Sequence, residues 1–250
     1  MGKITVIGLG PGSLEDMTPR ALRAIEAAEV VAGYNTYIRL IESLLDGKEV
    51  IGTAMMQEID RCRMAVESAL SGRNTVVVSS GDSGVYGMAG LVLELVLQHP
   101  AENRPEFDVI AGVSAVNAAA SVLGAPLMHD FAVISLSDLL TPWETIRKRV
   151  EAAADADFVL ALYNPKSKKR VKNIEEVREI FLKHRSPDTP VGIVTNASSD
   201  AQNKVISTLD SFTKEDISMF SLVIIGNSKT YVKDGYMITP RGYERKEPSL

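Results

Sequence analysis

The chain has 250 residues and a formal net charge of −5, with 45% hydrophobic and 24% charged residues. This composition is typical of a globular protein and excludes a disordered chain, which would be poor in apolar residues and rich in charge. The length allows one large domain or two domains of about 100–150 residues. The mild acidity argues against a nucleic-acid-binding protein, because such proteins usually carry a basic surface.

Cys62 is the only cysteine. One cysteine forms no intrachain disulfide and holds no iron–sulfur cluster by itself, so we expect neither, and a reducing cytoplasm is the natural compartment. Cys62 lies in a helix-like stretch, which favours a structural thiol over a catalytic one. The sequence shows no signal peptide and no run of about 20 apolar residues, so we expect no membrane association. No metal site is expected.

Short apolar runs alternate with helical patterns in the first half of the chain. Thr18 and Pro19 predict a helix start, with Thr18 as the cap and Pro19 in the first turn. Strands are expected over 4–7, 30–32, 75–79 and 107–111, and helices after residue 18 and over 37–45, 58–71 and 88–98.

The second half continues this alternation and adds hairpins. Helices are expected over 115–123, 143–154, 174–183 and 213–216, strands over 131–135, 158–163, 191–195, 204–208 and 222–225, and a hairpin turn at 233–236. The pattern predicts an α/β protein. A glycine turn near 112–125 predicts two lobes, 1–114 and 115–250, and the cleft between two such lobes is the default ligand site.

The first chemical candidate is the loop Gly8-Leu9-Gly10-Pro11-Gly12, directly after the first strand. Glycines at a strand end let the backbone approach a ligand closely. The loop departs from a dinucleotide fingerprint because Pro11 lacks an N–H and the helix begins too late to meet a pyrophosphate. A tight structural turn is the alternative interpretation.

Further loops follow other strands. The segment 80–90 holds four glycines around Asp82, which is suited either to binding ribose hydroxyls or an ammonium group or to stabilising its own turn. Ser114 follows a strand and is a candidate helix cap. The pairs Tyr163-Asn164 and Asn196-Ala197 end two strands of the second half. Loops at strand ends in both halves favour one shared ligand cleft.

Together these loops resemble the tetrapyrrole methylases, S-adenosylmethionine-dependent enzymes with two α/β lobes and the cofactor in the cleft between them. Longer strings at 33–37, 79–89, 124–131, 135–143 and 239–243 resemble the branch of that family that methylates C17 of cobalt-factor III or precorrin-3B. That reaction is coupled to ring contraction in cobalamin biosynthesis. A methyltransferase of the same superfamily acting on another tetrapyrrole, on RNA or on protein is the alternative. The motifs leave open whether the substrate carries cobalt.

The resemblance implies which residues bind S-adenosylmethionine and its product S-adenosylhomocysteine. The family often has proline after the Gly-Asp pair, where this chain has Ser83. The matching positions are Gly10, Pro11, Gly81, Asp82, Val85, Ser114, Ala115, Tyr163, Asn164, Asn196 and Ala197. The resemblance also implies a homodimer.

Methyl transfer to an electron-rich tetrapyrrole carbon needs positioning and no side-chain nucleophile. Ring contraction needs an acid or base, and the candidates are His129 with Asp130, Tyr34 and Tyr37, although His129 is equally well suited to a structural turn. The substrate carries many carboxylates. Lys166 and Lys168, in the densest basic run, and Arg241 are therefore the candidate substrate-binding residues, with a solvated loop as the alternative for the run.

Overall fold

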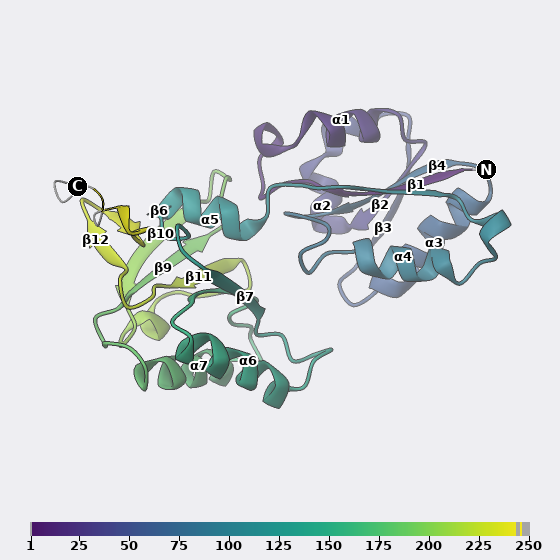
Figure 1. The fold of residues 1–250 in the computed structure, drawn as a ribbon. Helices are drawn as coiled ribbons and strands as arrows, with labels where there is room; N and C mark the ends of the chain where they lie inside the picture. Colours follow the sequence, from purple (N-terminus) through teal and green to yellow (C-terminus); the bar gives the residue numbers. More distant parts are fainter. Residues whose placement is uncertain (1, 244–245, 247–250) are drawn as a thin grey trace. The chain divides into compact units, whose positions relative to one another are not determined.

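The computed structural model describes residues 2–243 and 246, and it contains two compact units, Met1–Ala115 and Val116–Leu250 (Figure 1). The predicted lobe boundary falls between Ser114 and Ala115. Each unit is built on its own five-stranded sheet, and the predicted α/β class is confirmed. In the described residues no helix combines the length and the apolar character that a membrane span needs.

The first unit contains a fully parallel sheet with the strand order β3-β2-β4-β1-β5. Its strands are β1 (Lys3–Gly8), β2 (Val30–Tyr34), β3 (Glu49–Thr53), β4 (Asn74–Ser79) and β5 (Glu106–Ile110). Because all five run in the same direction, their carboxyl ends share one edge of the sheet.

Helices cover both faces of this sheet. Helices α1 (Pro19–Glu26) and α2 (Asn35–Leu40) pack on one apolar cluster, and α3 (Glu58–Leu70) and α4 (Ala89–Leu97) pack on another. The Thr18 side chain accepts a hydrogen bond of 3.2 Å from the Ala21 N–H, which confirms the predicted cap. The chain leaves β1 toward one face and β4 toward the other, so the adjacent strands β1 and β4 form a topological switch point.

The second unit contains a mixed sheet with the order β10-β9-β11-β8-β7. Its strands are β7 (Phe131–Ser135), β8 (Val159–Tyr163), β9 (Pro190–Thr195), β10 (Asn203–Thr208) and β11 (Ser221–Ile225). Strands β7 and β8 are parallel, whereas β11 is antiparallel to both of its neighbours and β10 is antiparallel to β9. Strands β7, β8 and β9 therefore end at the same edge.

Helices α6 (Trp143–Asp155) and α7 (Lys172–Leu182) lie side by side on one face of this sheet (Figure 1). Helix α5 (Ala115–Leu123) packs on the other face. The Leu123 side chain lies against Gly192, where a Cβ atom would come within 2.4 Å of Leu123 Cδ1. Gly192 thus leaves room for α5 on the sheet.

A small three-stranded sheet is also present, formed by β6 (Gly124–Ala125), β12 (Tyr231–Lys233) and β13 (Tyr236–Ile238). Strands β12 and β13 form the predicted hairpin. Asp234 and Gly235 have φ of 50° and 77°, as a tight hairpin turn requires.

Strands β3 and β6 were not predicted, and two predicted helices were wrong in detail. Strand β3 was not expected, because it lies at the sheet edge and three of its five residues are exposed, which removes the apolar signal. The helix predicted over 37–45 is α2 followed by a separate 3₁₀ turn, Glu42–Leu44. The helix predicted over 213–216 is only a 3₁₀ turn, Phe212–Lys214, and further 3₁₀ turns lie at Leu14–Asp16 and Ala101–Asn103.

Candidate functional site

The loops predicted to bind a ligand in the first unit follow three adjacent strands. Gly10 and Pro11 follow β1, Gly81 and Asp82 follow β4, and Ser114 follows β5. Since these strands are neighbours in a parallel sheet, the loops meet at one edge, beside the switch point between β1 and β4.

Gly10 and Gly81 join two of these loops through their backbones. The Gly10 N–H donates to the Gly81 carbonyl at 3.1 Å, and the Gly81 N–H donates to the Gly10 carbonyl at 2.7 Å. Both residues have positive φ, 80° and 64°, which glycine adopts without strain. The bridge is antiparallel, unlike the parallel pairing of β1 and β4, and it joins the two loops just beyond the ends of these strands.

Gly8 and Gly112 approach the same point even more closely. A Cβ atom on Gly112 would lie 2.3 Å from the Gly81 carbonyl oxygen, and one on Gly8 would lie 2.5 Å from that oxygen. The three loops are thus packed backbone against backbone, and only glycine fits at these two positions.

The Asp82 carboxylate braces the same region. Oδ1 accepts a hydrogen bond of 2.8 Å from the Gly84 N–H, and Oδ2 accepts one of 3.0 Å from the Gly112 N–H. The turn-stabilising role considered from the sequence is therefore present. The side chain is half-buried.

The segment after Asp82 turns one side chain inward and others outward. Ser83 is fully buried, and its Oγ atom has no hydrogen-bond partner among the described residues, although buried hydroxyls usually have one. Val85 and Tyr86 are 37% and 54% exposed. Ser114 is buried and Ala115 half-buried. The loop therefore offers backbone and an apolar side chain to a ligand.

Tyr34 lies at the carboxyl end of β2, on the same edge of the sheet. Its ring meets that of Tyr37 edge to face, with the centroids 5.3 Å apart. Burial, and then the neighbouring Tyr34, raise the pKa of Tyr37. Arg61 lies near this pair and is buried, which was not foreseen from the sequence.

In the second unit, Tyr163 is the last residue of β8 and Asn164 follows it, and Asn196 and Ala197 follow β9, at the same edge of the sheet. The Tyr163 hydroxyl accepts a hydrogen bond of 3.0 Å from the N–H of Val116, in the first turn of α5. Asn164 and Asn196 both have left-handed backbones, with φ of 49° and 51°. Asparagine tolerates this conformation better than most residues, which explains its use at both strand ends.

Asn164 is held by both its side chain and its carbonyl. Its Nδ2 donates to Ser135 Oγ at 3.0 Å, which joins the ends of β7 and β8. Its carbonyl accepts a hydrogen bond of 2.8 Å from Arg170, whose side chain also lies 3.6 Å from Asp138. Arg170 is thus a structural part of the basic run.

The proposed substrate-binding residues lie in two places. Lys166 is half-buried and Lys168 exposed, and both follow the Asn164 edge. Arg241 is exposed and follows β13 of the small sheet.

His129 and Asp130 precede β7, so they lie at the opposite end of that strand from Ser135 and the Asn164 edge. Both are exposed. The Asp130 N–H donates to His129 Nδ1 at 2.9 Å, and that nitrogen lies 3.8 Å from the Asp130 carboxylate. The structure therefore does not bring this pair to the strand ends that carry Tyr163 and Asn164.

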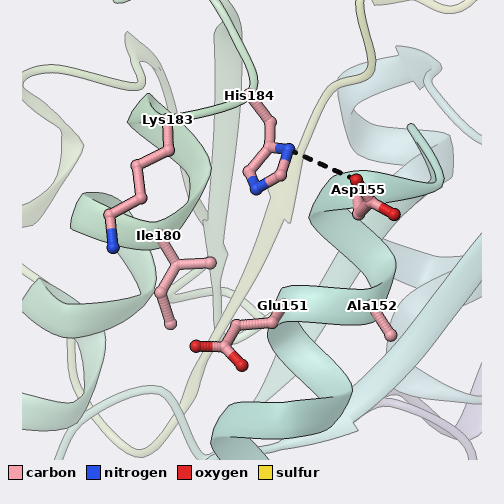
Figure 2. Close-up of a pocket in the computed structure, with 6 residues that line it drawn as sticks. All are labelled: Glu151, Ala152, Asp155, Ile180, Lys183 and His184. Atoms are coloured by element: carbon pink, nitrogen blue, oxygen red, sulfur yellow. Dashed lines mark ion pairs between the residues drawn. The ribbon is translucent and has the colours of Figure 1, made fainter.

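Figure 2 shows a surface pocket of about 340 Å³ between α6 and α7. Its residues are Glu151, Ala152, Asp155, Ile180, Lys183 and His184. His184 Nδ1 lies 3.8 Å from an oxygen of Asp155. Because α6 ends shortly before β8 begins, the pocket lies toward the amino end of that strand and contains none of the predicted site residues. Within the described residues, no group of three or more His, Cys, Asp or Glu is arranged to hold a metal ion.

Comparison with known proteins assigns the family. The model of the tetrapyrrole (corrin/porphyrin) methylases matches residues 3–213. A protein of Salmonella typhimurium named "Probable cobalt-factor III C(17)-methyltransferase" is 50% identical over 96% of this chain and 99% of its own length. The "Cobalt-factor III methyltransferase" of Priestia megaterium is 51% identical over 98% of this chain, which spans only 46% of that longer protein.

Solved structures agree. The crystal structure of the methyltransferase CobJ superimposes with a TM-score of 0.90 at 37% identity, covering 96% of this chain and 100% of that one. The resemblance expected from the glycine loops is confirmed, and the chain belongs to the tetrapyrrole methylases, a family of S-adenosylmethionine-dependent methyltransferases.

Proposed function

We propose that this chain transfers a methyl group from S-adenosylmethionine to C17 of cobalt-factor III or precorrin-3B, with ring contraction, in cobalamin biosynthesis. The observation that carries the proposal is the match with two cobalt-factor III methyltransferases across nearly the whole chain. The cobalt-containing substrate is favoured, since both names specify cobalt-factor III.

The loop edge of the first unit supports a cofactor site. S-adenosylmethionine supplies an electrophilic methyl group, and the protein has to hold the acceptor carbon in line behind it. The bridged loops of Gly10 and Gly81 give a rigid backbone frame, and Asp82 fixes that frame to Gly112. Val85 and the buried, unpartnered Ser83 hydroxyl fit a ligand held close to the backbone of this loop.

The remaining predicted cofactor contacts are proposed on the same grounds. Pro11 and Ser114 belong to the first unit, and Tyr163, Asn164, Asn196 and Ala197 lie on one sheet edge of the second unit. The left-handed asparagines turn the chain sharply after each strand, so the residues that follow lie at the strand ends.

Tyr34 is the best-placed candidate for the acid or base of ring contraction, because it lies on the sheet edge that carries the Gly81 loop. His129 and Asp130 remain candidates of the second unit, at the other end of β7 from Asn164. Lys166, Lys168 and Arg241 are proposed to bind substrate carboxylates, as cations on exposed or half-buried positions.

Two measurements test the function. Titration calorimetry with S-adenosylhomocysteine should show binding, and the purified protein should convert cobalt-factor III to a product that mass spectrometry finds one methyl group heavier. Metal-free precorrin-3B, offered in parallel, decides which form is preferred. Failure to bind the cofactor product, or methylation of ribosomal RNA or a protein in place of either tetrapyrrole, would overturn the proposal.

We also propose a homodimer in the cytoplasm. The reduced, buried Cys62 suits a reducing compartment. Light scattering after size-exclusion chromatography measures the assembly, and a mass equal to one 27.1 kDa chain would contradict the dimer.

A further inference from the structure

Arg61 is a buried cation that forms no ion pair with any residue that the structure describes. It is only 3% exposed, and it lies in the first turn of α3. Its Nη1 donates to Thr53 Oγ1 at 2.5 Å, and its Nη2 lies 3.7 Å from the Met88 sulfur. Its Nε donates no hydrogen bond to any described residue. A guanidinium has five N–H donors, and the described residues offer it only one hydroxyl and one weakly accepting thioether, so most of its hydrogen-bonding capacity is unmet.

Arg185 shows how this chain satisfies an arginine that is purely structural. It is similarly buried and its Nε also lacks a hydrogen-bond partner in the described residues, but its Nη atoms donate to the carbonyls of Gly226 and Phe158, and its Nε forms an ion pair with Asp157 at 3.3 Å. Its guanidinium also lies 4.5 Å from the centre of the Phe181 ring. Burying a charge without such partners is costly, so the environment of Arg61 is incomplete as a structural site.

The neighbours of Arg61 place it on the functional edge of the first unit. Thr53 is the last residue of β3, Met88 is the residue before α4, and both belong to the carboxyl edge of the sheet. Tyr37, which follows β2, is also within its electrostatic reach. Arg61 therefore lies beside the Gly81 loop, displaced toward β2 and β3 and away from β1 and β5.

We infer that Arg61 binds a carboxylate of the tetrapyrrole substrate. The inference rests on the proposed function, which supplies a substrate with many carboxylates. A planar guanidinium binds a carboxylate through two parallel N–H···O bonds, the geometry for which arginine is better suited than lysine. The thioether of Met88 is flexible and a poor acceptor, so it gives up its contact with Nη2 at little cost. The displacement toward β3 assigns the carboxylate to the substrate rather than to the amino-acid end of the cofactor.

The test compares Arg61→Met with Arg63→Met. Arg63 lies on the same helix, but it is exposed and forms an ion pair of 3.4 Å with the exposed Asp60. We expect Arg61→Met to raise the KM for cobalt-factor III about 10- to 100-fold, because one charge-assisted bidentate contact is lost. The kcat and the Kd for S-adenosylhomocysteine should change by less than about threefold, and Arg63→Met should match the wild type. Arg61→Lys should give an intermediate KM.

Denaturant unfolding of the variants distinguishes a binding role of Arg61 from a structural role. Replacing an unpaired buried charge with an apolar side chain of similar size is often neutral or stabilising, so Arg61→Met should unfold at the same or a higher denaturant concentration. Arg185→Met should unfold more easily. A wild-type KM in Arg61→Met overturns the inference. The inference is also overturned if Arg61→Met fails to fold while Arg61→Lys folds and has the wild-type KM, because Arg61 then has a structural role only.

Two further arms identify the source of the carboxylate. Substrate with its carboxylates esterified should bind the wild type less tightly than the free acid, and Arg61→Met should discriminate less between the two. Methylthioadenosine lacks the carboxylate of S-adenosylhomocysteine. If Arg61→Met bound S-adenosylhomocysteine more weakly than the wild type but bound methylthioadenosine equally well, Arg61 would be assigned to the cofactor instead. Binding of each tetrapyrrole is read from its visible absorption without turnover. A wild type that methylates neither tetrapyrrole contradicts the proposed function, whereas equal binding of acid and ester by an active wild type contradicts only the Arg61 subsite.

Discussion

The carboxylate of Asp82 holds the loop after β5 to the loop after β4, because its Oδ2 accepts a hydrogen bond from the Gly112 N–H at 3.0 Å. The other oxygen accepts from Gly84 in the same loop as Asp82. One side chain thus fixes two of the three loops at the switch point, and both of its oxygens act as acceptors.

Asp82→Asn should loosen this frame. An amide has one accepting oxygen, so its NH₂ group must face either the Gly84 or the Gly112 N–H. We expect the free energy of unfolding to fall by about 1–3 kcal/mol and the affinity for S-adenosylhomocysteine to fall at least about tenfold. Urea denaturation and calorimetry measure the two effects. Glu106→Gln, at an exposed ion pair with Lys3, is the control and should change neither. Wild-type affinity in Asp82→Asn would refute a role for this brace in cofactor binding.

Gly112→Ala should be strongly destabilising. The new Cβ would lie 2.3 Å from the Gly81 carbonyl oxygen and 2.7 Å from atoms of Gly8, all of them backbone. Backbone at a sheet edge cannot move aside as a side chain does, so the cost should reach about 2 kcal/mol or more. Gly90→Ala is the matched control, since nothing lies within 4 Å of its Cβ position in α4. That variant should gain about 0.5–1 kcal/mol from helix propensity. Equal midpoints for the two variants in thermal denaturation would contradict the close approach.

Asn164 provides a test of backbone strain. The backbone φ of Asn164 is 49°, so alanine at this position would be strained in the left-handed conformation. It would also lose the hydrogen bond to Ser135. Glycine loses the same hydrogen bond without the penalty. Asn164→Ala should therefore be about 0.5–1 kcal/mol less stable than Asn164→Gly, as measured by denaturant midpoints. The reverse order would show that the left-handed turn is not required there.

Cys62 should make stability depend on alkaline pH. Burial raises the pKa of its thiol to about 11, from 9.0 in a free thiol. The unfolded chain releases this proton first, so the stabilisation is complete below about pH 9 and is lost as the pH rises toward 11. The loss from this group is about 1.4 kcal/mol per pH unit. Measuring the free energy of unfolding against pH for the wild type and for Cys62→Ala, and subtracting one profile from the other, isolates the contribution of Cys62. Parallel profiles, or rapid reaction of the native thiol with a disulfide reagent at pH 8, would contradict its burial.

The sequence predicted the parts of the fold that depend on local patterns. The apolar run of β1, the Thr18 cap and the Asp234-Gly235 turn all lie in short segments whose chemistry is self-contained. The sequence did not predict β3, because an exposed edge strand needs no apolar residues. Its pairing with β2 depends on residues outside the local segment.

The features of the candidate site also differ in whether local sequence predicts them. Glycine loops after strands were visible, but the pairing of Asp82 with Gly112 joins two segments that no local pattern connects. Arg61 was missed because arginine on an amphipathic helix is normally exposed. Its spacing from Ala65 and Ala69, which share the buried face of α3, is the one local signal that would have indicated burial.

The bridge between Gly10 and Gly81 has a consequence for biogenesis. The ribosome releases the first glycine loop long before β4 exists, so the Gly10 carbonyl and N–H remain hydrated while α1, β2, β3 and α3 are synthesised. Bringing β1 and β4 together closes a long chain segment, which is slow because the conformational entropy is lost before stabilising contacts form. Because β1 pairs with β4 and β5, which are both synthesised after it, the first glycine loop acquires its final shape only when β4 inserts between β1 and β2.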